Sequence, residues 1–215
     1  MKFEQVADFE IKQQDKTQVR INNDAPQAAS IDLLGEEGEI DQEVLEEMYG
    51  DEALKLENTF TVEQFRDGEV IHSETVSNMV TNAAINDILD TYFGATAKKA
   101  GFFLGLIDAT GFTAVALADT MAAHAGWTEF VTYTEAVRQG WTAAAAATQA
   151  ITGVAVSEFT IGTVAAQSIQ GLFVTDSNAK SGVVGFLWST ALFSSPAPVV
   201  TGDVFRVTYT LRLGN

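Results

Sequence analysis

The stretch at residues 203–213, DVFRVTYTLRL, decides the fold class of this chain. Apolar residues occupy every second position, and polar residues occupy most positions between them. A period of two places successive side chains on opposite faces of a strand. Antiparallel sheets with one face on the core and one in water show this alternation. The stretch therefore predicts a half-buried antiparallel strand, with Phe205, Val207, Tyr209, Leu211 and Leu213 on one face and Arg206, Thr208, Thr210 and Arg212 on the other.

Short segments of similar character recur from residue 59 onward, separated by Gly, Ser, Asn and Asp. Residues 59–65 and 69–76 flank Arg66-Asp67-Gly68 and predict a hairpin. About eight short strands at spacings of about 8–12 residues predict a mainly β fold, specifically an antiparallel β-sandwich or jelly-roll-like domain. The other strands are expected at residues 102–107, 127–133, 158–164, 168–175 and 183–193.

One packed helix is expected within this β domain. Apolar residues recur at three- and four-residue steps from Met79 to Phe93, Ser77 and Asn78 supply the cap, and Gly94 ends the segment. The alanine-rich residues 142–150 fit either a helical turn or a loosely packed loop, because alanine favours helix but the segment lacks large apolar anchors.

The charge distribution divides the chain near Glu57. Residues 1–58 carry 16 acidic and five basic side chains, whereas residues 59–215 carry 13 and seven. We therefore expect an acidic, extended N-terminal arm at residues 1–58 and a β-sandwich domain at residues 59–215.

The arm contains one segment with helical spacing, at residues 40–49 (IDQEVLEEMY). A helix of about ten residues is marginal alone in water, so it would become ordered only by docking on another surface. Leu45 and Met48 on its apolar face are therefore candidate contact residues. The alternative interpretation is a disordered acidic tail.

Composition excludes several classes of function. The net charge of −17 argues against nucleic acid as a partner, since phosphate binding needs a basic patch. No run of eighteen apolar residues is present, so no membrane span is expected. The absence of cysteine excludes disulfides and thiolate metal sites.

The polar residues do not form a recognisable catalytic set, and no cofactor or metal is expected. His124 follows Asp119 at a spacing that matches no zinc signature, so it is interpreted as a structural residue bonded to local backbone. His72 is interpreted as a surface or sheet-edge residue of a strand. The aspartates beside Gly, Ser, Asn or Thr are interpreted as turn formers rather than calcium ligands. The glycines of residues 101–105 (GFFLG) and 182–185 (GVVG) are interpreted as packing glycines in strands.

The most distinctive stretch is residues 119–142, DTMAAHAGWTEFVTYTEAVRQGWT. Aromatic residues are enriched at protein interfaces, so Trp127 and Trp141 are candidate subunit contacts. Burial in an ordinary core is the alternative for both.

This stretch, together with GFFLGLIDATGF at residues 101–112, SIQGLFVTDSNAKSGVVGFLWSTALF at residues 168–193 and VVTGDVFRVTYTLRLG at residues 199–214, resembles a family of tailed-bacteriophage virion structural proteins. The similarity covers residues 59–215, with DTMAAHAGW as its most specific part. It implies a non-enzymatic head decoration (cement) protein on the capsid surface, assembled in the host cytoplasm. The implied partners are the major capsid protein and further copies of the chain, as a dimer or trimer.

Two other functions remain open at this point. The same fold could serve in a phage tail or head fibre that contacts the host surface, although no repeat or coiled-coil stalk is visible. An enzyme that cleaves glycans with two carboxylates is also possible, because residues distant in sequence can converge in the fold.

Overall fold

The computed structural model describes residues 18–20, 30–32 and 55–214, which belong to two separate units. In the first unit, β1 (Gln18–Arg20) pairs antiparallel with β2 (Ser30–Asp32). The helix predicted at residues 40–49, with Leu45 and Met48, lies outside the described residues. The second unit spans Lys55–Gly214, so residues 55–58, which we had placed in the arm, belong to its first strand.

The second unit is built on a ten-stranded sheet in the order β6-β5-β10-β11-β4-β3-β12-β8, with β7 added beside β5 and β9 beside β12. Every pairing between its named strands is antiparallel, which confirms the mainly β, antiparallel class. The strands are β3 (Lys55–Arg66), β4 (Glu69–Val80), β5 (Phe102–Asp108), β6 (Glu129–Phe130), β7 (Gln139–Trp141), β8 (Ala150–Thr152), β9 (Ser157–Thr160), β10 (Gln167–Thr175), β11 (Leu187–Val199) and β12 (Val204–Gly214).

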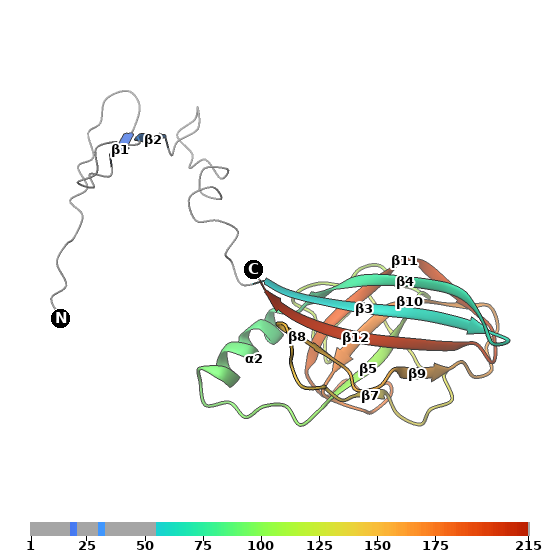
Figure 1. The fold of residues 1–215 in the computed structure, drawn as a ribbon. Coiled ribbons are helices and arrows are strands. Elements are labelled where there is room, and N and C mark those ends of the chain that lie inside the picture. The colour runs from blue at the N-terminus through green and yellow to red at the C-terminus, as the bar shows by residue number, and fades with distance from the viewer. Residues whose placement is uncertain (1–17, 21–29, 33–54, 215) are drawn as a thin grey trace. The chain divides into compact units, whose positions relative to one another are not determined.

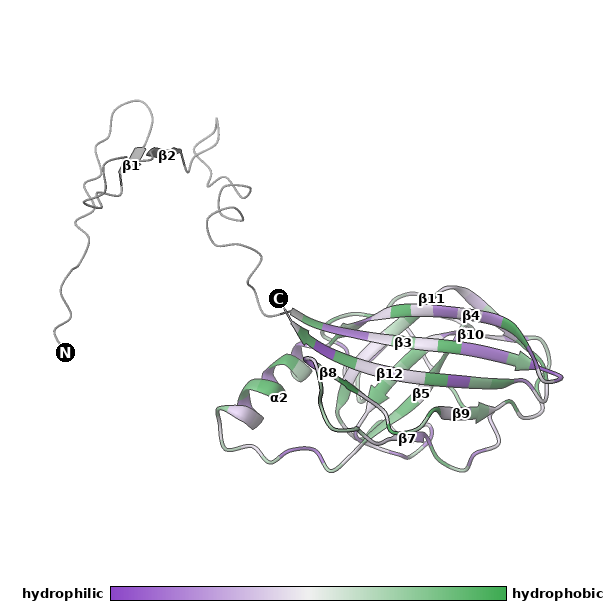
Figure 2. Cartoon of the chain, viewed as in Figure 1, coloured by the Kyte–Doolittle hydropathy of each residue, from purple (hydrophilic) through white to green (hydrophobic). Residues whose placement is uncertain are grey.

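The strand β12 carries the predicted alternation. Phe205, Val207 and Tyr209 are buried, whereas Arg206 between them is exposed. Figure 2 shows this alternation as hydrophobic and hydrophilic bands along the strand. The apolar face leaves the core at the end of the strand, where Leu213 is 44% exposed.

The predicted hairpin is confirmed, and both of its strands are longer than expected. Asp67 and Gly68 form the turn with positive φ values of 52° and 84°, the backbone geometry that Asp-Gly turns favour. At the far end, Met79 and Val80 continue β4 and pair with Thr190 and Ser189 of β11.

The helix α2 (Asn82–Tyr92) therefore starts later than the predicted cap at Ser77 and Asn78. Its true N-cap is Thr81, whose hydroxyl oxygen accepts a hydrogen bond from the Ala84 N–H at 3.1 Å. Apolar spacing alone did not separate the end of the strand from the start of the helix. At 11 residues, this one helix of the described part is too short to cross a membrane.

The sheet folds back on itself around the main core, as Figure 1 shows with β3 and β12 crossing β5, β10 and β11. The strand β4 pairs with β3 through residues 69–77 and with β11 through residues 78–80, so it belongs to both halves of the sheet. Although β3 and β4 separate β11 from β12 in the strand order, Phe193 of β11 stacks on Phe205 of β12 at 6.4 Å between ring centroids. The strands form one hydrogen-bonded path, and the β-sandwich or jelly-roll architecture stays a prediction.

Three predicted strands differ from the structure in their bounds, and the alanine-rich residues 142–150 follow the loop interpretation. Residues 142–149 form a loop with isolated bridges from Ala143 to Gly153 and from Ala147 to Ala150, the first residue of β8. The strand expected at residues 127–133 is reduced to Glu129–Phe130. The strand expected at residues 158–164 ends at Thr160. The strand expected at residues 183–193 begins only at Leu187, because Val183 and Val184 lie exposed in the preceding loop.

Candidate functional site

One concave site within Lys55–Gly214 is a pocket of about 460 Å³ with aromatic walls, which we call the Trp141 pocket. Its walls come from four strands: Phe102 of β5, Trp141 of β7, Trp188 of β11 and Tyr209 of β12. Ile151 and Leu211 add aliphatic surface, and Lys98 and Lys99 lie at the pocket in the segment that follows α2. Its volume is in the range of small-molecule sites, and its lining combines an apolar body with a few charged groups.

Tyr209 organises the two indoles of this pocket. Trp188 Nε1 donates to the Tyr209 hydroxyl at 3.0 Å, and Trp141 Nε1 donates to the Tyr209 carbonyl at 3.1 Å. The ring of Phe102 meets Trp188 edge-on at 5.2 Å between centroids, a favourable aromatic geometry. Because the protein already satisfies both indole N–H groups, the walls offer carbon surface rather than hydrogen-bond donors.

The phenol of Tyr209 is neutral at physiological pH. Burial raises its pKa, and the opposing hydrogen bonds from Trp188 and Asn78 do not reverse this shift. The charge of the pocket therefore comes from its lysines.

Lys98 and Lys99 are two of only seven basic residues in positions 59–215. Lys99 Nζ lies 3.1 Å from Asp87 Oδ1 of α2 and 4.7 Å from the centre of the Phe186 ring. These two contacts fix the position of the Lys99 side chain in the lining of the Trp141 pocket. Lys98 is exposed, and no described residue forms an ion pair with it.

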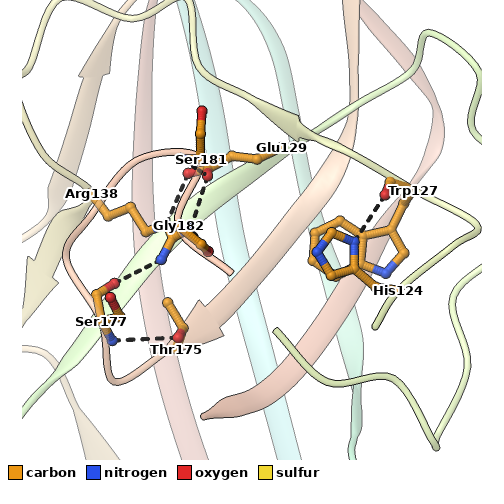
Figure 3. Close-up of polar contacts among 8 residues, drawn as sticks. All are labelled: His124, Trp127, Glu129, Arg138, Thr175, Ser177, Ser181 and Gly182. Atoms are coloured by element: carbon orange, nitrogen blue, oxygen red, sulfur yellow. Dashed lines mark hydrogen bonds and ion pairs between the residues drawn. The ribbon is translucent and has the colours of Figure 1, made fainter. Parts of the chain in front are cut away.

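A second, smaller depression of about 230 Å³ lies beside the distinctive stretch, next to the buried Arg138 (Figure 3). Arg138 Nε and Nη2 donate to the two carboxylate oxygens of Glu129, each at 2.9 Å. Its Nη1 donates to the Ser177 carbonyl at 2.9 Å, and Nη2 also donates to the Gly182 carbonyl at 3.1 Å. The guanidinium thus joins β6 to the loop between β10 and β11.

His124 and Trp127 lie on the other side of this depression. Their rings stack at 3.9 Å between centroids, and His124 Nδ1 donates to the Trp127 carbonyl at 2.9 Å. Trp127 Nε1 donates to Asp119 Oδ2 at 3.0 Å, and the same oxygen accepts the Ala116 N–H at 2.9 Å. Asp119, His124 and Trp127 therefore form a local packing unit. Their polar side-chain atoms form hydrogen bonds with one another and with nearby backbone groups.

The other polar side chains considered in the sequence pair with their neighbours. No group of three or more His, Asp or Glu side chains within the described residues could hold a metal ion. Asp203, which we interpreted as a turn former, accepts the Val200 N–H at 3.0 Å and also pairs with Arg66 Nη2 at 2.8 Å. His72 Nε2 contacts Glu74 Oε1 at 2.8 Å on β4.

Of the four candidate contact residues, only the two tryptophans can be placed. Trp127 is 2% exposed and packs against Phe173 inside the unit. Trp141 is 9% exposed and lines the Trp141 pocket. A direct subunit contact through either residue stays a prediction. Sequence reasoning did not single out Arg138 or the lysine pair. It placed Tyr209 on the inner face of its strand but did not predict its contacts with Trp141 and Trp188, which lie 68 and 21 residues away.

An exposed apolar stripe on α2 was also missed. Ile85, Leu89, Tyr92 and Phe93 recur along one side of the helix, and the last two are 81% and 79% exposed. Contiguous exposed apolar surface is often found at sites that contact a partner.

No protein-family model matches the sequence, and no curated protein matches it.

Proposed function

We propose that this chain is a non-enzymatic structural component of a tailed-bacteriophage virion, specifically a decoration (cement) protein that binds the major capsid protein on the head surface. The support is the resemblance carried by residues 59–215, together with a compact β unit whose best-defined sites suit contact. In this proposal the protein is assembled in the host cytoplasm and acts as a dimer or trimer on the shell.

The observation that carries the proposal is the apolar stripe on α2. Tyr92 and Phe93 place two large aromatic rings side by side in the solvent, with 5.0 Å between ring centroids. Each square ångström of apolar surface that a partner covers contributes about 25 cal/mol, and aromatic residues dominate the binding energy of many interfaces. A contact surface of this kind suits attachment to a shell.

Weak individual contacts suffice for a decoration protein. Subunits that touch neighbouring sites on a shell bind at high effective concentration, so their avidity exceeds the affinity of one contact. The acidic arm, now limited to residues 1–54, would add a second contact through Leu45 and Met48 on an adjacent subunit. High net charge keeps the free protein soluble before assembly.

Co-sedimentation of the full chain with empty shells of its phage tests the proposal. We expect saturable binding and a higher temperature of shell disruption. The double variant Tyr92→Ser/Phe93→Ser should bind weakly, whereas Val70→Ser/Ile71→Ser, which removes two exposed apolar side chains at the β3–β4 turn, serves as the matched control. Absence of binding to shells would overturn the cement proposal and direct attention to tail or head-fibre structures.

A further inference from the structure

Beyond attachment to a shell, we propose that the Trp141 pocket binds an amphipathic carboxylate, a small molecule with an apolar chain or ring and one anionic head, such as a medium-chain fatty acid. The apolar body lies against Trp141 and Trp188, and the carboxylate pairs with Lys98. This inference does not depend on the virion proposal, because it concerns a different surface from the α2 stripe.

The walls select an apolar ligand. The two indole N–H groups are occupied by Tyr209, as described above, and the neutral phenol accepts one of them. A sugar would need several free donors and acceptors, and these walls leave it few. An apolar chain needs none, so the aromatic carbon surface suits it better.

A glycine leaves room for the Trp141 indole in the pocket wall. A Cβ atom at Gly153 would lie 2.8 Å from Trp141 Nε1, closer than side chains normally approach. A side chain at this position would therefore displace the indole. The indole is 9% exposed, so a ligand would cover surface that water now touches.

The charges select an anionic head. Lys98 and Lys99 bring two adjacent cations to an apolar pocket in a chain with a net charge of −17. Asp87 neutralises Lys99 in part, whereas the ammonium of Lys98 is exposed and can turn toward a ligand. A carboxylate at the mouth would accept a charge-assisted hydrogen bond from Lys98, which is stronger than a neutral one.

The experiment uses the full chain with two anionic probes, 8-anilinonaphthalene-1-sulfonate and decanoate, and with decanol as the neutral analogue. Pocket binding is read from energy transfer between tryptophan and the bound naphthalene, and decanoate is scored by displacement. We expect saturable binding, displacement by decanoate, and an affinity for decanol at least about tenfold lower, because the charged hydrogen bond is absent.

Three variants locate the site. Lys98→Glu should weaken decanoate binding about tenfold or more, since it replaces the attracting charge by a repelling one. Arg206→Glu makes the same change of charge at an exposed position on the other face of β12 and should leave binding unchanged. Ala143→Phe, at an exposed position in the pocket wall, should block binding without disturbing the fold, which circular dichroism checks.

Three results would overturn the inference. They are the absence of saturable binding, equal affinity for decanoate and decanol, and unchanged binding in both Lys98→Glu and Ala143→Phe. If Tyr92→Ser/Phe93→Ser abolishes probe binding while the pocket variants retain it, the probe binds the α2 stripe and the pocket is not the site. Shell binding is scored separately, so failure of either proposal leaves the other standing.

Discussion

Arg138 and Glu129 form a bidentate ion pair inside the second unit. Nε and Nη2 of Arg138 each lie 2.9 Å from a different carboxylate oxygen of Glu129. The Arg138 side chain is fully buried and that of Glu129 is 7% exposed. The carboxylate also accepts the Ser181 N–H at 2.7 Å, so both partners have several hydrogen bonds. A buried pair is tolerable only when such bonds satisfy its remaining polar atoms.

Replacing Arg138 by Leu should therefore be strongly destabilising. The change leaves Glu129 buried without its cation and deprives the Ser177 and Gly182 carbonyls of their donors. Breaking one side of a buried pair costs about 3–5 kcal/mol. Urea unfolding followed by tryptophan fluorescence measures the loss. Arg206→Leu is the matched control, since its pair with Glu158 is exposed on both sides and should contribute about 0–1 kcal/mol. Equal losses in the two variants would contradict this account.

Gly105→Ala should destabilise the protein through a steric conflict. Gly105 of β5 pairs directly with Phe173 of β10, and a Cβ atom there would lie 2.3 Å from the Phe173 ring. Overpacking of this kind costs about 1–3 kcal/mol. Calorimetry of the unfolding transition measures it. Gly140→Ala, whose Cβ would meet Phe103 at an ordinary 3.9 Å, should be nearly neutral. The double variant Gly105→Ala/Phe173→Leu should recover part of the loss if the ring is the cause.

Asp203 should make stability depend on pH in the acidic range. Burial alone would raise its pKa, but the hydrogen bonds from Arg66, the Val200 N–H and Gln64 lower the pKa below its ordinary value. Because the folded pKa lies below the unfolded one, the contribution is present above about pH 4 and is lost as the pH falls through the folded pKa. The free energy of unfolding should therefore fall on acidification, and by less in Asp203→Asn.

Urea unfolding of the wild-type protein and of Asp203→Asn, compared at each pH, separates the contribution of Asp203 from that of other carboxylates, including Glu74. We expect their difference in stability to shrink steadily below about pH 4. A difference that stays constant to about pH 2.5 would show that the Asp203 charge is not responsible.

Thr81→Ala should loosen the start of α2. The Thr81 hydroxyl accepts the Ala84 N–H at 3.1 Å and donates to the Leu187 carbonyl at 2.8 Å, so it caps the helix and ties it to β11. Loss of such a cap costs about 0.5–2 kcal/mol. Hydrogen exchange should become faster at the first turn of α2, and Thr81→Ser, which keeps the hydroxyl, should remain close to wild type. Unchanged exchange in Thr81→Ala would contradict the capping role.

Much of the architecture could be predicted from local pattern. The β3–β4 hairpin depends on Asp67-Gly68 and two flanking strands, all close in the sequence, so the turn and its strands were found. The packing role of Gly105 was also predicted, although its partner Phe173 was not. The same interpretation was wrong for Gly182 and Gly185, which lie in the loop before β11 rather than in a strand. His124 was interpreted as a structural residue, and its bond to the Trp127 carbonyl agrees with this interpretation.

The errors fall where a distant segment decides the local structure. Met79 and Val80 fit the helical spacing, yet they extend β4 because β11, more than a hundred residues later, offers Ser189 and Thr190 as partners. Val183 and Val184 fit a strand by β propensity, but Arg138 and Glu129 hold the neighbouring Ser181 and Gly182 in a loop. Propensity is a weak prior that such tertiary contacts override.

By itself, the sequence determined the mainly β class, the inward face of β12 at Phe205, Val207 and Tyr209, and the acidic character of the chain. The acidic character follows from composition. The other two properties follow from the alternation of apolar and polar residues, which is local and can be recognised wherever the strand lies in the fold. Only the tertiary structure decided that Phe102, Trp141, Trp188 and Tyr209 share one pocket and that Arg138 meets Glu129. The pocket requires strands far apart in the chain to come together, and local periodicity does not encode that pairing. The ion pair requires β6 and β7 to lie beside β5, which the spacing of residues 129 and 138 alone does not reveal.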